Sequence, residues 1–368
     1  MKRALWRRFD WPLFALAVAL SFFGVAMIAS ALSGNQVLAQ WPWRQAAFLG
    51  FGLILLFLTA AFDYRLLAPV AYLLFGVLTI ALLAIYLFGT IAGGAQRWLA
   101  LGDFLLQPSE LAKLGAILAL AQLLSSREAR GRLESIVTPL MAVVMLIPAV
   151  MLVYLQPNLS TALSLLVIAG VMLVMGGMPL RHVLLLAVAA AVAAVAAWRF
   201  LLQDYMKDRI LAFLDPSLVT AAERYNIEQA MISIGSGGWL GRGLFRGSQN
   251  QLHFLRVRHT DFIFSVTAEE LGFVGAVALI VLFVLLLMRL AHIAGIASDT
   301  FGRLIVVGVL AMILFQVAVN IGINLNLLPA TGVPLPFVSY GGSSLWATLI
   351  GIGLAESVAM RYRKFGFD

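Results

Sequence analysis

Long apolar segments recur along the whole sequence, and they restrict the fold more than any other feature. Segments of roughly 18 or more mainly apolar residues are long enough, as helices, to cross the hydrocarbon core of a bilayer. Hydrophobic residues make up 62% of the chain and charged residues 11%, against about 25% charged in an average soluble domain, so a soluble core could not bury these segments. We therefore predict an all-α, polytopic membrane protein with about ten transmembrane helices. The predicted spans are 11–32, 45–62, 67–88, 108–124, 137–155, 159–176, 182–200, 263–288, 304–326 and 343–360.

The positions of lysine and arginine predict the orientation of these spans. With the N-terminus inside, most basic residues fall in inner segments, and the short outer loops hold only Arg44 and Arg97. Because short cytoplasmic loops are enriched in lysine and arginine, both termini are predicted to be cytoplasmic. Residues 201–262 then form one large extracytoplasmic loop between the seventh and eighth spans. The net charge of +8 lies at span ends, which predicts no nucleic-acid partner, and residues 1–368 are predicted to form a single domain.

The large loop carries a helix signal of its own. Thr220 and Glu223 have the spacing of a capping box, and Ile227, Met231 and Ile234 recur at helical spacing before a glycine-rich stretch. These residues predict a short amphipathic helix. It either lies on the membrane surface or packs on the bundle of spans.

Ionisable side chains within a span are candidate functional residues, because a charge buried in lipid is costly. Glu110 and Lys113 lie one turn into the fourth span at i,i+3 spacing. One interpretation is that they neutralise each other and hold two helices together. The other is that they line a polar cavity, and the pair can have both roles. Glu269 and Glu270 lie inside the eighth span. Glu356 is predicted to extend toward the inner surface and is left out of the site.

The segment 256–261 is the richest in functional groups. Arg256, Arg258 and His259 stand within five residues of Asp261, where the large loop re-enters the membrane. Guanidinium groups suit phosphate oxygens, and a carboxylate beside an apolar wall can act as a general base. The alternative is an ordinary loop edge whose charges are solvated among lipid headgroups.

Residues 327–344 form a proline- and glycine-rich stretch before the tenth span. Irregular backbone at membrane depth is tolerated only where protein or a wet cavity surrounds it. Gly341 and Gly342 are predicted to leave N–H groups open to an anion at the helix start, or the stretch is a structural re-entrant turn. The scattered histidines have no metal-ligand spacing, and no nucleotide-binding motif is present, so neither a metal site nor a resident cofactor is predicted.

Five segments together resemble motifs of the SEDS family (shape, elongation, division and sporulation). They are GAQRWLALG (94–102), QPSELAK (107–113), QPNLSTA (156–162), HTDFIFSVTAEELGF (259–273) and LPATGVPLPFVSYGGSS (328–344). The order of the motifs, the number of predicted spans and the large loop match over essentially the whole chain. The last two motifs are more similar to the elongation branch of the family than to its division branch. The family usually has Asp and Gly where this chain has Asn158 and Ser160, so we predict no metal there.

The resemblance implies a peptidoglycan glycosyltransferase of the bacterial inner membrane that polymerises lipid II into β-1,4 glycan on the outer face. It places the family's key aspartate at Asp261, and we predict that Asp261 acts as general base of an inverting reaction with undecaprenyl pyrophosphate as leaving group. Pyrophosphate substrates can bring their own divalent cation, so a divalent cation is possible. The implied partners are a class B penicillin-binding transpeptidase, elongation-complex membrane proteins and membrane lipids. The candidate substrate-binding residues are Arg97, Glu110, Lys113, Arg256, Arg258, His259, Ser343 and Ser344.

Two other functions fit the same sequence. A lipid II flippase would also have many spans and a buried Glu–Lys pair, but transporters often contain two related halves, and none is visible here. A scaffold that recruits cell-wall enzymes would explain partners but not the segment around Asp261.

Overall fold

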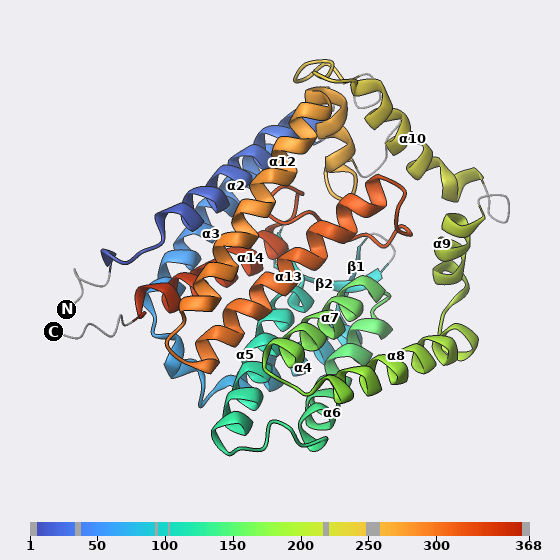
Figure 1. Ribbon diagram of the computed structural model, residues 1–368. Helices are drawn as coiled ribbons and strands as arrows, with labels where there is room; N and C mark the ends of the chain where they lie inside the picture. The colour runs from blue at the N-terminus through green and yellow to red at the C-terminus, as the bar shows by residue number, and fades with distance from the viewer. Residues whose placement is uncertain are drawn as a thin grey trace.

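The computed structural model describes residues 6–33, 38–92, 95–101, 104–215, 221–247 and 258–362, and over these ranges the regular structure is helical apart from one small sheet (Figure 1). Each predicted span coincides with a helix. The helices are α2 (Trp11–Ala31), α3 (Trp41–Ala61), α4 (Ala71–Phe88), α5 (Pro108–Ala129), α6 (Val137–Leu155), α7 (Leu159–Met175), α8 (Leu180–Phe200), α12 (Ile263–Ile296), α13 (Thr300–Asn324) and α14 (Gly342–Met360).

Within the described ranges, eight of these helices are long and apolar enough to cross a membrane. The two others are α7, which has 17 residues, and α5, which has 22 residues and carries both an acidic and a basic residue in its terminal turns. The all-α polytopic fold is thus confirmed, whereas the count of about ten crossings remains a prediction.

The central helices of the bundle are α13 and α14. α14 packs mainly along α3, and α13 contacts α12, α7 and α5. The contact between α14 and α3 is close because Gly353 has no side chain: a Cβ there would lie 1.9 Å from Thr59 Oγ1. In the most apolar window of α14, 83% of residues are buried, against none in α8. α8 is therefore a peripheral helix whose apolar side chains are suited to face lipid.

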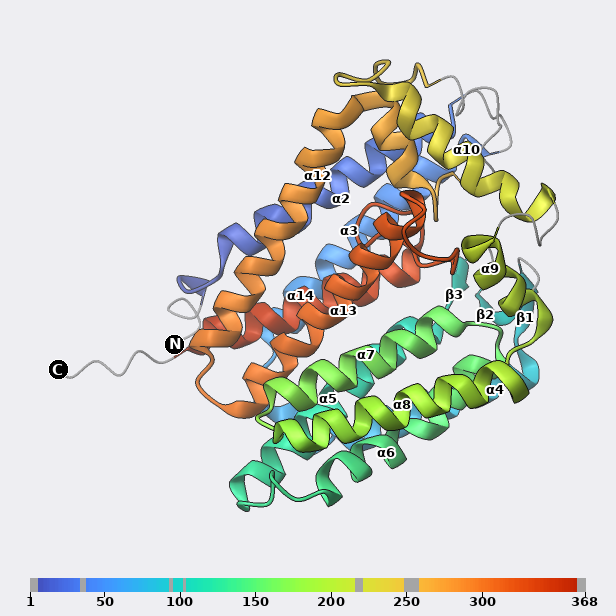
Figure 2. The ribbon, with the colours of Figure 1, turned by 45° about the vertical axis from the view of Figure 1, so that its right-hand side comes forward.

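α12 is sharply bent rather than straight. Gly272 has φ 68° and ψ −169°, a conformation that only glycine adopts readily. The bend separates a short limb, 263–271, from a long limb, 273–296 (Figure 2). The N–H groups of Phe273 and Val274 donate to carbonyls of Gly238 (2.8 Å) and Trp239 (3.1 Å) in the large loop. The predicted eighth span therefore contains two segments, and only the second is long enough to cross.

The large loop contains α9 (Asp204–Leu214) and α10 (Ala221–Gly237). α10 begins where the capping-box spacing predicts, although Thr220 lies outside the described residues. It packs against α12, with Ala230 and Ser233 fully buried. Of the two placements left open by the sequence, the structure supports packing on the bundle.

A three-stranded antiparallel sheet, which the sequence analysis did not predict, lies between α4 and α5. Its strands are β1 (Thr90–Ala92), β2 (Ala95–Leu101) and β3 (Phe104–Leu106), in the order β1-β2-β3. The sheet holds Arg97 on β2 and lies at the same end of the molecule as α9 (Figure 2). We call this end the loop end, and the opposite end, where both chain termini lie (Figure 1), the terminal end.

Candidate active site at the loop end

Asp261 lies just before α12, and its main chain is tightly held. Its carbonyl oxygen accepts hydrogen bonds from the side-chain amides of Asn320 (3.0 Å) and Asn324 (2.9 Å) on α13. The carbonyl of the preceding residue, Thr260, accepts one from the hydroxyl of Ser339 (2.6 Å). These bonds fix the backbone through main-chain carbonyls, while the carboxyl group of Asp261 has a hydrogen bond with the side chain of Thr260.

The carboxyl group of Asp261 packs against the turn that follows α13. Gly332 has φ +72°, and a Cβ there would lie 3.4 Å from Oδ2 of Asp261. The preceding carbonyl, that of Thr331, accepts a hydrogen bond from the hydroxyl of Ser160 at the start of α7. Segments distant in the sequence, 156–162, 259–261 and 328–344, thus meet at one place, as expected if they form a single site.

Two arginines from separate elements act on Asp261. Burial raises the pKa of the Asp261 carboxyl above its usual range, and the positive charges of Arg209 and Arg97 oppose that shift. Arg97 comes from β2 and Arg209 from α9. The structure therefore brings the predicted Arg97 to Asp261 and adds Arg209, which has no distinctive sequence context and was not predicted.

Glu110 and Lys113 form a buried ion pair at the start of α5, with 2.8 Å between Nζ and Oε2 and side-chain exposures of 5% and 2%. The hydroxyl of Ser343, at the start of α14, accepts a hydrogen bond from the N–H of Gln107 (2.9 Å) and donates to the carbonyl of Leu105 (3.3 Å). Ser343 thus ties the start of α14 to the start of α5, beside the ion pair. Ser344 follows it in the same turn and is half-buried.

Arg258 and His259 have more limited roles than their charges suggest. Arg258 is buried, and its Nε donates to the carbonyl of Ala31 at the end of α2. The ring of His259 lies edge-on to Trp41, with centroids 5.0 Å apart. Burial, and secondarily the charge of Arg258, lower the pKa of His259 to about 4, so its imidazole is neutral near pH 7 and supplies no cation. Arg256 lies outside the described residues.

One expectation for the turn before α14 is wrong. The N–H of Gly341, predicted to be open to an anion, donates to Oε1 of Gln45 on α3 at 3.2 Å. The neighbouring N–H of Tyr340 donates to the carbonyl of His259 (2.8 Å). The N–H groups of this turn therefore bond to other parts of the protein, as expected if the stretch is a structural re-entrant turn.

Glu269 and Glu270 hold the large loop against the short limb of α12. The carboxylate of Glu270 accepts hydrogen bonds from the hydroxyl of Ser30 (2.7 Å to Oε1) and the N–H of Phe245 (3.3 Å to Oε2). The carbonyl of Glu269 accepts one from the N–H of Arg242 (3.0 Å). Both side chains are fully buried, and the contacts give a structural role to the carboxylate of Glu270 and to the main-chain carbonyl of Glu269.

The prediction that Glu356 extends toward the inner surface is also wrong. Its side chain is fully buried, and Oε2 accepts a hydrogen bond from the N–H of Asp10 (2.9 Å). Arg361, five residues further along the chain, pairs with Asp63 (3.4 Å). The helix end packs so closely on the N-terminal segment that the carboxylate finds a partner there.

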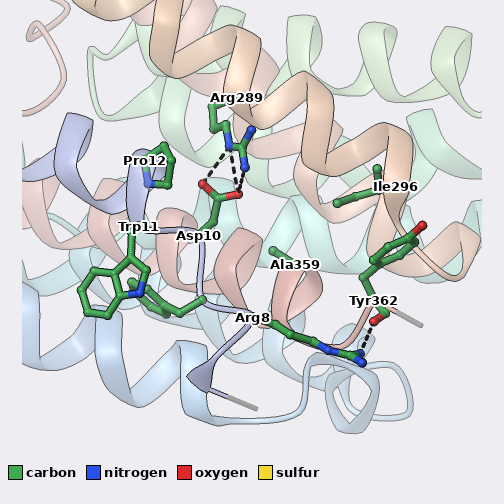
Figure 3. Close-up of a pocket in the computed structure, with 9 residues that line it drawn as sticks. Arg8, Asp10, Trp11, Pro12, Arg289, Ile296, Ala359 and Tyr362 are labelled. Carbon is green, nitrogen blue, oxygen red and sulfur yellow. Dashed lines mark hydrogen bonds and ion pairs between the residues drawn. The ribbon is translucent and has the colours of Figure 1, made fainter. Parts of the chain in front are cut away.

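A pocket at the terminal end contains further paired charges. Asp10 caps α2 by accepting from the N–H of Leu13 (3.0 Å), and its carboxylate receives Nε (2.8 Å) and a terminal nitrogen (2.6 Å) of Arg289 (Figure 3). Arg8 donates to the carbonyl of Tyr362 (2.6 Å). The side chains of Asp10 and Arg289 bind each other, and Arg8 binds the main chain just after α14, so these contacts join the N-terminal segment to α12 and to the end of α14.

Asn158, which replaces the usual acid of the family motif, caps α7. Its Oδ1 accepts a hydrogen bond from the N–H of Thr161 (3.2 Å). Asparagine and aspartate cap helices about equally well, so the loss of charge at this position leaves the cap in place. Across the residues that the structure describes, no group of three or more acidic or histidine side chains gathers to hold a metal ion.

Comparisons with known proteins agree with this arrangement. The sequence family described as cell cycle protein FtsW/RodA/SpoVE matches residues 10–364. The peptidoglycan glycosyltransferase MrdB of Escherichia coli K12 is 36% identical over 97% of this chain and 95% of its own length. The peptidoglycan glycosyltransferase RodA of Treponema pallidum is 31% identical over 96% of this chain and 98% of its own.

Solved structures are similar over the same range. A chain from a peptidoglycan synthase complex, studied for the coordination of polymerization and crosslinking, has a TM-score of 0.83 and 37% identity, covering 96% of this chain and 98% of that one. The rod shape determining protein RodA of Thermus thermophilus has a TM-score of 0.71 and 35% identity, covering 97% and 98%. Because the family model covers residues 10–364 and the relatives match over nearly their full length, this chain belongs to the FtsW/RodA/SpoVE family of cell cycle proteins.

Proposed function

We propose that this chain is a peptidoglycan glycosyltransferase that polymerises lipid II into β-1,4 glycan during cell elongation. Relatives named peptidoglycan glycosyltransferase, at 31% and 36% identity over nearly the full length, support the activity. The observation that carries the proposal is the arrangement at Asp261. Hydrogen bonds fix its main chain, and the charges of Arg97 and Arg209 act on its carboxyl group. We place the loop end outside an inner membrane and both termini in the cytoplasm, following the distribution of basic residues.

The stereochemistry of the reaction determines which groups it needs. The donor sugar is α-linked to pyrophosphate and the product is β-linked, so a single displacement with inversion is sufficient and no enzyme nucleophile is required. The acceptor 4-hydroxyl attacks the anomeric carbon of the donor, the bond to the pyrophosphate oxygen breaks, and Asp261 receives the hydroxyl proton. A carboxyl whose pKa is raised toward the working pH is a stronger base. This agrees with the direction of the pKa shift at Asp261.

The leaving group, undecaprenyl pyrophosphate, gains negative charge as the bond breaks. Cations placed where that charge develops stabilise the transition state. Arg97 is our first candidate for such a cation. Arg209 joins it because its positive charge also acts on the Asp261 carboxyl. Lys113 is the second, at the start of α5. Arg256 and Arg258 follow, and Arg258 is weaker because its Nε is bonded to α2. The pyrophosphate can bring its own divalent cation.

A class B penicillin-binding transpeptidase is the proposed partner. The solved chain with a TM-score of 0.83 comes from a synthase complex that couples polymerization to crosslinking, which supports this choice. Other membrane proteins of the elongation complex and membrane lipids complete the proposed surroundings.

The test is lipid II polymerisation by the purified full-length chain in liposomes, with the transpeptidase present. Glycan ladders that depend on this chain would support the proposal. Transfer of lipid II between leaflets without polymer would replace it with the flippase function. Neither activity, in a sample that remains folded, would leave the scaffold function.

A further inference from the structure

Two buried asparagines on α13 hold the main chain of Asp261 from the same side. Asn320 and Asn324 are one helical turn apart, and their exposed fractions are 1% and 0%. Each donates from Nδ2 to the Asp261 carbonyl, at 3.0 and 2.9 Å. Carboxamides buried within an apolar helix carry a desolvation cost unless they are bonded, so a pair that converges on one carbonyl is a specific arrangement.

The same pair joins the segments around Asp261. Asn320 also donates to the carbonyl of Val333 (2.7 Å), next to Gly332, which lies against the Asp261 carboxyl. Oδ1 of Asn324 accepts from both the N–H (3.1 Å) and the hydroxyl (2.6 Å) of Ser265 in the short limb of α12. The spacing between Asp261, the Gly332 turn and the start of α12 is therefore set from one face of α13.

We propose that Asn320 and Asn324 are positioning residues for the polymerase reaction, acting by fixing the Asp261 main chain so that its carboxyl stays against the Gly332 turn. This proposal rests on the proposed function of Asp261 as general base. A general base must remain within hydrogen-bond reach of the proton that it takes, and a displacement of about 1 Å can cost about 100-fold in rate. The hydrogen bonds of the two asparagines go to Asp261, Val333, Ser265 and each other, so we assign them a positioning role that acts through Asp261.

The variant that tests this role is Asn324→Asp. It keeps the size of the side chain and the acceptor oxygen for Ser265, and it removes the Nδ2 donor to the carbonyls of Asp261 and Asn320. The matched control is Gln316→Met, which changes a buried carboxamide on the same face of α13, eight residues before Asn324. Oε1 of Gln316 has no hydrogen-bond partner in the described part of the chain, so the control should retain wild-type activity.

The measurement is steady-state polymerisation of lipid II by the full-length chain in liposomes, with kcat and KM determined separately. For Asn324→Asp we expect kcat to fall by about 10- to 100-fold with KM within about twofold, because substrate binding is retained while the base is misplaced. Equal kcat in Asn324→Asp and Gln316→Met, or a raised KM with unchanged kcat, would overturn the proposal.

A milder variant keeps the proposal testable if Asn324→Asp does not fold. Ser265→Ala removes one hydrogen bond to Asn324 and is expected to lower kcat by about two- to fivefold with KM unchanged. Unchanged kcat in this variant would contradict the proposal. Failure of the proposed function gives a different result, because the wild-type chain itself would then make no polymer.

Discussion

The two ends of the bundle use charge in different ways. At the terminal end, charged side chains bind each other, as Asp10 and Arg289 do (Figure 3). At the loop end, two asparagines bond to the main-chain carbonyl of Asp261, while its carboxyl has a hydrogen bond with Thr260 and two arginines act on it from separate elements. The difference indicates that paired side chains stabilise the fold at one end, and that at the other the fold holds a side chain ready for chemistry.

The Glu110–Lys113 pair allows the sharpest test of this difference, because it is a closed ion pair located at the loop end. Lys113→Met should cost about 3–5 kcal/mol in stability, since it leaves Glu110 buried without its partner, and should abolish polymerisation. The double variant Glu110→Gln/Lys113→Met should regain most of the stability but remain inactive. Thermal unfolding and lipid II polymerisation measure the two effects, and an active double variant would show that the pair is only structural.

At the terminal end the opposite result is expected. Asp10→Ala should lower the free energy of unfolding by about 1–2 kcal/mol, through the loss of the α2 cap and of a partly exposed ion pair with Arg289. Polymerisation per folded molecule should not change. Thermal unfolding in detergent, with activity measured well below the transition, checks both. A large loss of activity with intact stability would mean that the terminal end takes part in the reaction.

The pH dependence of polymerisation should reveal the arginines near Asp261. The active form of a general base is deprotonated, so activity should rise with pH through the Asp261 pKa, which burial raises. Arg209 lowers that pKa, so Arg209→Gln should move the acidic limb of the profile to higher pH. Arg199→Gln, at an exposed position at the end of α8, is the control. An acidic limb that stays in place in Arg209→Gln would remove this arginine from the site.

The smallest expected effect is at Ser160, where the chain departs from the usual family motif. Ser160→Ala removes the hydrogen bond to the Thr331 carbonyl, worth about 0.5–1.5 kcal/mol, next to the turn that contacts Asp261. Polymerisation should fall by about two- to fivefold. Ser164→Ala is the control, because Ser164 is buried one turn later on α7 with no hydroxyl partner in the described ranges. Equal activity in both variants would separate this turn from Asp261.

The helices could be predicted from the sequence because apolar length alone determines where a chain can cross a bilayer. The segment of α5 was predicted as a span and is a helix, although it is not among the eight helices that are long and apolar enough to cross a membrane. The bend at Gly272 was missed because residues 263–288 were taken as one continuous span, although Glu269 and Glu270 directly precede the bend. It becomes visible only when the loop carbonyls that bind Phe273 and Val274 are known.

The site was predicted less completely, for a related reason. Asp261 and Arg97 are marked by their motifs, whereas Arg209 lies on an ordinary amphipathic helix and gains its role from tertiary position. Asn320 and Asn324 could have been recognised from the sequence, since two carboxamides four residues apart in an apolar span are expected to bond to neighbouring segments. Glu356 was misread because its partner, the main chain of Asp10, is 346 residues away in sequence.

The central claim is that Asp261 acts as the general base, and Asp261→Asn tests it most directly. The substitution keeps the shape of the side chain and removes its basicity, so polymerisation of lipid II should fall by at least about 100-fold while thermal unfolding matches the wild-type chain. Both samples should contain the same transpeptidase in the same liposomes. Polymerisation at the wild-type rate by the folded variant would contradict the account.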